Sequence, residues 1–342
     1  MGKTTLLNYL RRWVTIRDRP SAFEALCASL LCVALVVLLW YALTAGRPEE
    51  RIIDPVTLPS VGETMGQFHR LWFERAVARS AMWSLGRVVG GFVLAAAVAV
   101  PLGVVAGSFL RLNFFLRPLS IFGRNIPIAA LIPLTMMWFG LDEIQKVMFI
   151  FLASVAFVFF DSVNAVQGVP DSYLDAAYTL GARFTPREGA IRSVIGGVIY
   201  GLVFAAAYYL LAQRPGPADT QMWAGWRVGF CLTGCAGLVT GVALWFPITA
   251  YQPIRKVLFP LAMPDIVNSL RLLFGLAFGY IMLAEVINAT YGLGAIILTS
   301  QRVGPREHIY LSLMLIALLA FGIDRGILSV QRWLFPYRRV GE

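Results

Sequence analysis

Long apolar stretches separated by short polar segments run along most of the chain. Each stretch has about 20 residues or more, which is enough to cross a hydrocarbon core of roughly 30 Å. Backbone polar groups in lipid need partners within their own segment, so each span must be helical. The pattern predicts an all-α membrane protein with about eight transmembrane helices, over 22–45, 83–108, 117–139, 145–166, 191–212, 226–249, 267–287 and 308–329.

The composition supports a membrane protein. Of the 342 residues, 58% are hydrophobic and 14% are charged, against about a quarter charged in soluble domains. The formal charge is +10, and the basic residues lie between the apolar stretches. Such residues mark cytoplasmic loops and contact anionic lipid headgroups. No basic stripe with interleaved aromatic residues is present, so nucleic acid is excluded as a partner.

The same pattern divides the chain into four parts. Residues 1–21 form a basic amphipathic segment on the cytoplasmic surface, 22–45 form an uncleaved first span, 46–82 form an external segment, and 83–337 hold the core. The distribution of basic residues predicts that both termini are cytoplasmic. No part is a soluble domain large enough to hold a nucleotide. The chain is therefore not expected to be an enzyme, and an ATPase that drives it would be another chain.

A short helix is predicted in the polar segment after Pro170, over Asp171 to Ala182. Small residues in this segment let a partner approach the backbone closely, and Gly181 can end the helix in the left-handed conformation. From the residues alone, two interpretations stay open: an ordinary capped helix at the membrane surface, and a docking helix.

Polar residues within the spans are candidates for a transport pathway. Arg124 and Asn125 precede Pro127, which invites a break in the helix, and an arginine at a broken helix would suit an anion. Arg87 and Arg271 either snorkel to the membrane surface or face the pathway. For Glu285 an ion pair with a nearby arginine is the favoured role. The candidate pathway set is Arg124, Asn125, Pro127, Trp138, Arg271 and Glu285.

Several motifs occur in an order that resembles one known family. Asp175-Ala176-Ala177 followed by Gly181 and Ala182 resembles the EAA motif of ATP-binding-cassette importer permeases, with Asp in place of Glu. The others are Leu58-Pro59-Ser60, Ser84-Leu85-Gly86-Arg87, Pro101-Leu102-Gly103, Ile126-Pro127, Ile132-Pro133-Leu134, Trp138-Phe139-Gly140, Ala284-Glu285 and Gly292-Leu293-Gly294. Over about residues 55–337 the chain resembles the nitrate, sulfonate, taurine and bicarbonate branch.

This resemblance implies a type I ABC importer transmembrane domain in the bacterial cytoplasmic (inner) membrane. It implies a second copy of the chain, two ATPase subunits that carry ATP and magnesium, and an extracytoplasmic substrate-binding protein. No cofactor is expected on this chain. The expected ATPase-coupling residues are Asp175, Ala176, Ala177, Gly181, Ala182 and Pro260. Gly292 and Gly294 are candidates for contact with the binding protein, and a plain turn is the alternative for them.

The chain departs from the family just after this motif. The matching continuation, Arg255 to Pro260, comes about 70 residues late, after two apolar runs at about 184–252. We expect a transmembrane hairpin inserted into the six-helix core, which splits the coupling loop. Docking of Asp175 to Ala182 as in the family, packing on lipid, binding of an accessory subunit and bracing of the dimer are the open alternatives.

Two other functional classes compete with an importer permease. A secondary transporter or channel that works without ATP would be expected to show an internal repeat or intramembrane carboxylates along a path. An intramembrane enzyme would need a catalytic constellation, and the chain has only two histidines. The sequence favours the permease of an ATP-driven importer, with the ATP-independent transporter as the alternative. The resemblance implies that the substrate is a small anionic nutrient.

Overall fold

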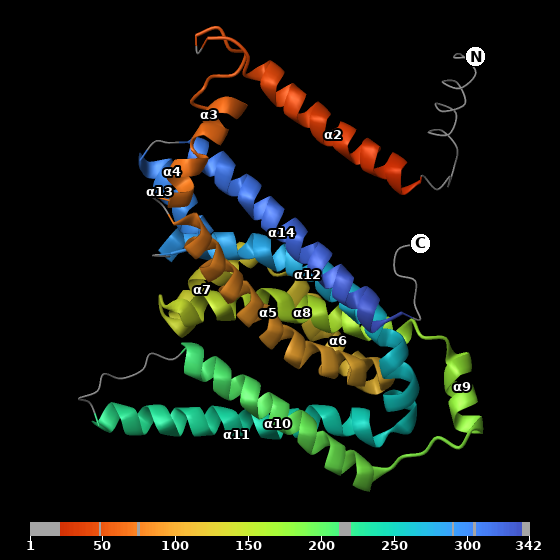
Figure 1. Cartoon of the computed structure of the whole chain (residues 1–342). Helices are drawn as coiled ribbons and strands as arrows, with labels where there is room; N and C mark the ends of the chain where they lie inside the picture. Colours follow the sequence, from red (N-terminus) through yellow and green to blue (C-terminus); the bar gives the residue numbers. More distant parts are fainter. Residues whose placement is uncertain are drawn as a thin grey trace, which may run out of the picture.

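The computed structural model of the chain is a bundle of long helices (Figure 1). It describes residues 21–47, 49–73, 76–211, 220–288, 291–303 and 306–336. Within these residues, seven helices are long and apolar enough to cross a membrane, or eight if one bent pair counts as one span. The predicted all-helical membrane fold is confirmed. Apart from Ser21, the amphipathic segment predicted over 1–21 lies outside the described residues.

Three helices form the centre of the bundle: α5 (Val77–Ser108), α8 (Glu143–Gln167) and α12 (Phe259–Asn288). Gly91 and Gly103 let α5 approach α8 closely. A Cβ added at Gly91 would lie 2.5 Å from the Val147 carbonyl oxygen, and one at Gly103 would lie 2.5 Å from Ser162 Cβ. Small residues at such contacts are typical of membrane helices.

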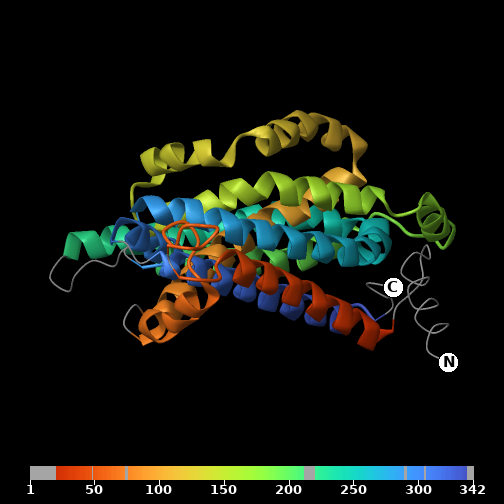
Figure 2. The same cartoon turned by 90° about the horizontal axis from the view of Figure 1, so that it is seen from above.

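The span predicted as one helix over 117–139 is broken. Helix α6 (Leu110–Asn125) ends before Pro127, and η1 (Ile128–Ala130) leads into α7 (Leu131–Phe139). The two halves are bent by 88° at this break. Pro127 has no backbone N–H to continue the α6 hydrogen-bond ladder, and it biases the residue before it toward extended backbone. Figure 2 shows α6 and α7 as a layer along one side of the bundle.

Shorter helices and two further long ones complete the core. Helices α13 (Leu293–Val303) and α14 (Glu307–Leu334) pack against α12. Helix α2 (Ala22–Leu43) lies at the edge of the bundle (Figure 1). Two short helices, α3 (Val61–Gly66) and α4 (Phe68–Phe73), connect it to α5.

The remaining helices lie where the sequence departs from the family. A nine-residue helix, α9 (Asp171–Thr179), is followed by α10 (Pro186–Leu211) and α11 (Thr220–Ala250), which lie side by side. A π-helical turn, η2 (Ile254–Leu258), leads directly into α12. Helix α11 contacts α5 and η2, so the α10–α11 pair is joined to the core along α11.

Candidate functional site

The long helices run between two ends of the bundle, which differ in chemistry. We call one the α9 end, because α9 lies there, across the direction of the long helices (Figure 1). We call the other the α13 end, where α7 and α13 lie. The sequence-predicted residues fall into three groups: at the α13 end, at the α6–α7 break, and at the α9 end.

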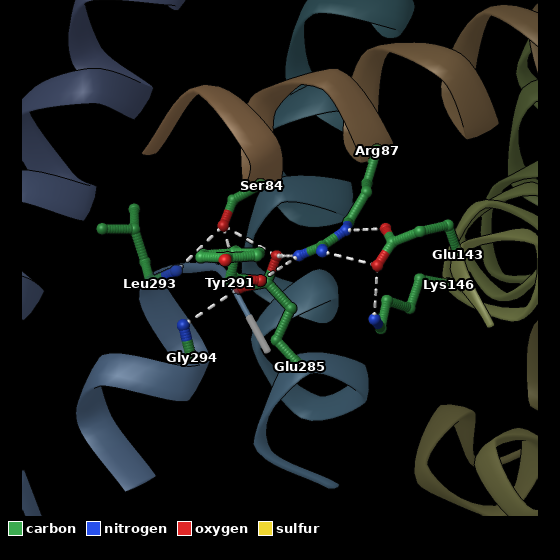
Figure 3. Close-up of polar contacts among 8 residues, drawn as sticks. All are labelled: Ser84, Arg87, Glu143, Lys146, Glu285, Tyr291, Leu293 and Gly294. Atoms are coloured by element: carbon green, nitrogen blue, oxygen red, sulfur yellow. Dashed lines mark hydrogen bonds and ion pairs between the residues drawn. The ribbon is translucent and has the colours of Figure 1, made fainter. Parts of the chain in front are cut away.

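A network of charged side chains holds the α13 end together (Figure 3). Arg87 Nη1 of α5 donates to Glu285 Oε1 of α12 at 2.6 Å. The same guanidinium donates from Nε and Nη2 to Glu143 of α8, the latter at 2.8 Å. Lys146 Nζ donates to Glu143 Oε1 at 2.8 Å. Two cations thus balance two carboxylates, and the network joins three helices.

Glu285 is fully buried, with 0% of the residue exposed. Its carboxylate accepts from Gly294 N at 3.0 Å and lies 2.7 and 2.8 Å from Ser84 Oγ, which in turn accepts from Leu293 N at 3.0 Å. Arg87 Nη1 also donates to the Tyr291 carbonyl at 2.7 Å. Buried charges are tolerated when they are paired and fully hydrogen-bonded. The ion pair expected for Glu285 is confirmed, with Arg87 as its partner.

Gly292 lets the turn between α12 and α13 close over this network. Its φ is +140°, and an added Cβ would lie 2.5 Å from Glu285 Oε2 and 2.8 Å from Arg87 Nη1. Both Gly292 and Gly294 are buried, whereas Tyr291 beside them is exposed. The structure therefore does not present the two glycines on the surface as contacts for a partner protein; they shape the turn, and Tyr291 is its accessible side chain.

The break between α6 and α7 holds three of the predicted pathway residues. Arg124 is partly buried, while Asn125 and Pro127 are exposed. Trp138, which is also exposed, lies near the far end of α7 and not at the break. The Arg124 guanidinium carbon lies 3.5 Å from the centre of the Phe160 ring. Its Nε is buried and has no hydrogen-bond partner among the described residues.

An acidic side chain that the sequence analysis missed lies near this break. Asp161 of α8 lies within the field of the Arg124 charge and close to the Ser269 side chain of α12. The sequence offers no direct signal for this, because three helices distant in sequence meet here. Arg271, the other predicted pathway cation, lies elsewhere: its Nε is 3.2 Å from Asp324 Oδ1 of α14.

Helix α9 ends as the sequence predicts. Gly181 has φ +82°. Its N–H donates to the Tyr178 carbonyl at 3.0 Å, and the Ala182 N–H donates to the Ala177 carbonyl at 3.0 Å. This pair of bonds is a Schellman motif, which satisfies the last carbonyls of a helix. Nothing lies within 4 Å of a Cβ added at Gly181, so its role is conformational.

One side of α9 packs on the bundle and the rest is open. Ala177 is buried, and Leu174 packs against the cluster that contains Ile254 and Leu258 of η2. The predicted continuation of the coupling segment, which includes most of η2, follows α9 by about 70 residues in sequence but contacts it in space. Exposed members of the predicted coupling set are Asp175, Ala176, Gly181 and Pro260, while Ala182 is partly buried.

Two members of the α13-end network, Glu143 and Lys146, were missed in the sequence analysis. They are three residues apart on α8, as Ser84 and Arg87 are on α5, so each pair lies on one helix face. This spacing was the available signal. Within the described residues, no group of three metal-ligating side chains could hold a metal ion.

Comparison with known proteins finds similarity to one family of transport proteins. The model of the "Binding-protein-dependent transport system inner membrane component" family matches residues 99–212, which include the α6–α7 break and α9. The chain is also similar to ABC transporter permeases over most of its length. The putative ABC transporter permease protein MJ0413 of Methanocaldococcus jannaschii is 23% identical to it over 312 residues, which is 90% of each chain.

Two further matches extend the comparison. The taurine transport system permease protein TauC of Escherichia coli is 22% identical to this chain over 310 residues, covering 89% of this chain and 87% of that one. A solved structure of inward-facing conformations of the MetNI methionine ABC transporter has a TM-score of 0.47 and 16% identity, covering 75% of this chain and 94% of that chain.

Proposed function

We propose that this permease forms the alternating-access path of an ATP-driven importer for a small anion. ATP and magnesium would bind to two partner ATPase subunits, and this chain would hydrolyse no ATP itself. A second copy of the chain would complete the path, and an extracytoplasmic substrate-binding protein would deliver the substrate. The cytoplasmic side of the bacterial inner membrane would be at the α9 end, with both termini there.

The observation that carries this proposal is the form of α9. It is a nine-residue helix outside the candidate spans, it packs on the core through Ala177 and Leu174, and it leaves the rest of its surface free. Leu180 at its end is 87% exposed. A short rigid element of this kind can transmit rigid-body movement between two proteins. The α9 helix would dock on the ATPase and couple its closure to the permease.

An affinity pull-down from the native membrane in mild detergent tests the coupling role. We expect an ATPase to co-purify with the natural chain and to be lost with Asp175→Lys and Gly181→Asp. Glu49→Lys is the matched control, because Glu49 is an exposed carboxylate in the segment between α2 and α3, and Figure 1 shows α3 at the opposite end of the bundle from α9. If no ATPase co-purifies with the natural chain and transport persists in ATP-free vesicles, the importer proposal is wrong and a secondary transporter is favoured.

For the path itself we propose the surface at the α6–α7 break. Arg124 has a buried Nε without a partner among the described residues, beside the exposed Asn125 and Pro127. Trp138 is exposed near the far end of α7, and we include it as a second contact on the same path. A guanidinium held on an aromatic ring and short of a hydrogen-bond partner suits an oxyanion. The name of the taurine permease agrees with this, because taurine carries a sulfonate group, which is an oxyanion.

Uptake of radiolabelled taurine by the assembled importer in proteoliposomes tests this site. We expect Arg124→Gln to lower uptake at low substrate concentration at least tenfold, and Arg124→Lys to restore part of it because the charge is retained. Arg111→Gln is the control, since Arg111 is an exposed arginine of the same helix near its other end. Equal uptake by Arg124→Gln and the natural chain would remove Arg124 from the path.

A further inference from the structure

The segment that leads into the α10–α11 hairpin is hydrogen-bonded to the segment that follows it. Gln252 N donates to the Arg183 carbonyl at 3.2 Å, and Arg183 N donates to Gln252 Oε1 at 3.2 Å. Two residues further along, Thr185 N donates to the Ala250 carbonyl at 2.8 Å. Phe184 and Tyr251 between them form an antiparallel bridge. We call residues 183–185 with 250–252 the clasp.

The clasp is fixed to its surroundings on both sides. The centroid of the Tyr251 ring lies 4.6 Å from that of Phe184 and 5.3 Å from that of Phe109 at the α5–α6 turn. On the hairpin side, Thr249 Oγ1 donates to the Gly189 carbonyl at 3.0 Å. A Cβ at Gly189 would lie 2.5 Å from Ala250 Cα, so the two hairpin helices touch at their base. The base of the hairpin is therefore held in place relative to α9 and η2.

Apolar side chains continue from α9 onto this clasp. Tyr173 and Tyr178 of α9 are exposed, as is Leu180 directly after the helix, and Phe184 of the clasp is half exposed. Helix α9 is too short to cross a bilayer and lies across the direction of the spans (Figure 1). An exposed apolar surface outside the hydrocarbon region indicates a protein contact.

Exposed cations border the apolar side chains on the hairpin side. They are Arg183, Arg187 at the start of α10 and Lys256 of η2. Among the described residues, none of these three forms an ion pair with a carboxylate. The nearby Glu188 is already approached by Arg192 at 3.8 Å and Arg255 at 4.0 Å. The net charge on this side of the surface is positive.

We infer that the hairpin base is part of the docking surface for the ATPase, so that α9, the clasp and η2 together form one composite surface. This inference rests on the proposed function. The partner it fits is an ATPase whose groove has an apolar floor for Tyr178, Leu180 and Phe184 and an acidic rim facing Arg187 and Lys256. The inserted hairpin then enlarges the coupling surface that it interrupts in sequence.

Titration of the purified permease with the ATPase subunit that co-purifies with it tests the inference. We expect Arg187→Glu and Lys256→Glu each to weaken binding about three- to tenfold at low salt, with the deficit shrinking as salt is raised, because rim charges act through screened electrostatics. Arg332→Glu is the matched control: the same charge change at the same end, on α14 and away from α10 (Figure 1). It should bind within twofold of the natural chain.

A photo-cross-linker placed at position 187, with one at position 332 as the control, gives a readout that does not depend on stability. The inference requires an adduct with the ATPase from position 187 and none from position 332. Unchanged binding by both charge reversals, with binding lost in Leu180→Asp, would overturn the inference and leave the proposed function intact. Adducts only with lipid or with a second copy would also overturn it. No ATPase binding by the natural chain would overturn the proposed function as well.

Discussion

The two ends of the bundle use a glycine at positive φ for opposite purposes. At the α13 end, Gly292 closes a turn over a buried ionic network, and no side chain would fit there. At the α9 end, Gly181 ends a helix in open space, and its surroundings would admit a side chain. At the first end, the buried charged and polar groups are paired with one another inside the protein. The second leaves apolar side chains and cations exposed, as a surface for another protein does.

The largest effect is expected from breaking the closed end at its most buried charge. Glu285→Ala leaves Arg87 buried with one carboxylate fewer, and breaking a buried pair in this way costs about 3–5 kcal/mol. The midpoint of thermal unfolding in detergent, followed by tryptophan fluorescence, measures the loss. ATPase binding at the α9 end by the fraction that remains folded should be unchanged.

Glu285→Gln separates charge from hydrogen bonding at the same position. The amide retains an acceptor for Ser84 and Gly294 but removes the negative charge facing Arg87. We expect the thermal midpoint of Glu285→Gln to lie between that of the natural chain and that of Glu285→Ala. A midpoint for Glu285→Ala equal to that of the natural chain would show that the network contributes no stability.

The next effect in size comes from the turn that covers the network. Gly292→Ala places a Cβ against Glu285 and Arg87 in a backbone conformation that alanine rarely adopts. The expected cost is about 2–3 kcal/mol, from backbone strain together with displaced contacts. Gly275→Ala in α12 is the control, because nothing lies within 4 Å of its added Cβ and its φ is helical. A loss in Gly275→Ala as large as in Gly292→Ala would contradict this explanation.

Much of the fold is predictable from the sequence because hydropathy and helix ends are local properties. The apolar stretches identify the long helices, and Gly181 identifies the end of α9. The pairing of Arg87 with Glu285 joins residues 198 apart in sequence, so only the presence of an arginine partner could be expected. The 88° bend at the α6–α7 break was likewise beyond the sequence, because proline marks a break without setting its angle.

The clasp is a second feature that local reasoning could not supply. The sequence predicts two cytoplasmic ends for the hairpin, but the bonds between Arg183 and Gln252 depend on how α10 and α11 pack along their whole length. The buried position of Gly292 and Gly294 has the same origin, since it follows from the turn folding back onto α5.

A smaller effect is expected from the glycine of the open end. Gly181→Ala keeps every neighbour at ordinary distance and changes only the backbone preference, which costs roughly 1 kcal/mol for alanine in the left-handed region. The thermal midpoint should fall less than in Gly292→Ala. ATPase affinity should fall by several fold, because the end of α9 frays at the docking surface. Reduced stability with unchanged affinity would separate Gly181 from docking.

The smallest effect is expected from an exposed ion pair outside the spans. Arg51 Nη2 lies 2.9 Å from Glu63 Oε1, and the Glu63 side chain is 41% exposed. The hydrogen bond from Arg51, followed by that from the Ser60 backbone, lowers the pKa of Glu63 from 4.5 to about 2. Since the folded-state pKa is the lower one, the carboxylate stabilises the fold fully above the ordinary value, and the stabilisation is lost as pH falls toward about 2.

Glu63→Gln should therefore cost less than about 1 kcal/mol at pH 7, because solvent screens exposed pairs. The unfolding midpoints of Glu63→Gln and the natural chain should converge as the pH falls from 5 toward 2. A gap between the two midpoints that stays constant over this range would show that the charge of Glu63 contributes nothing. A gap at pH 7 as large as that for Glu285→Ala would erase the contrast between the buried network and the exposed pair.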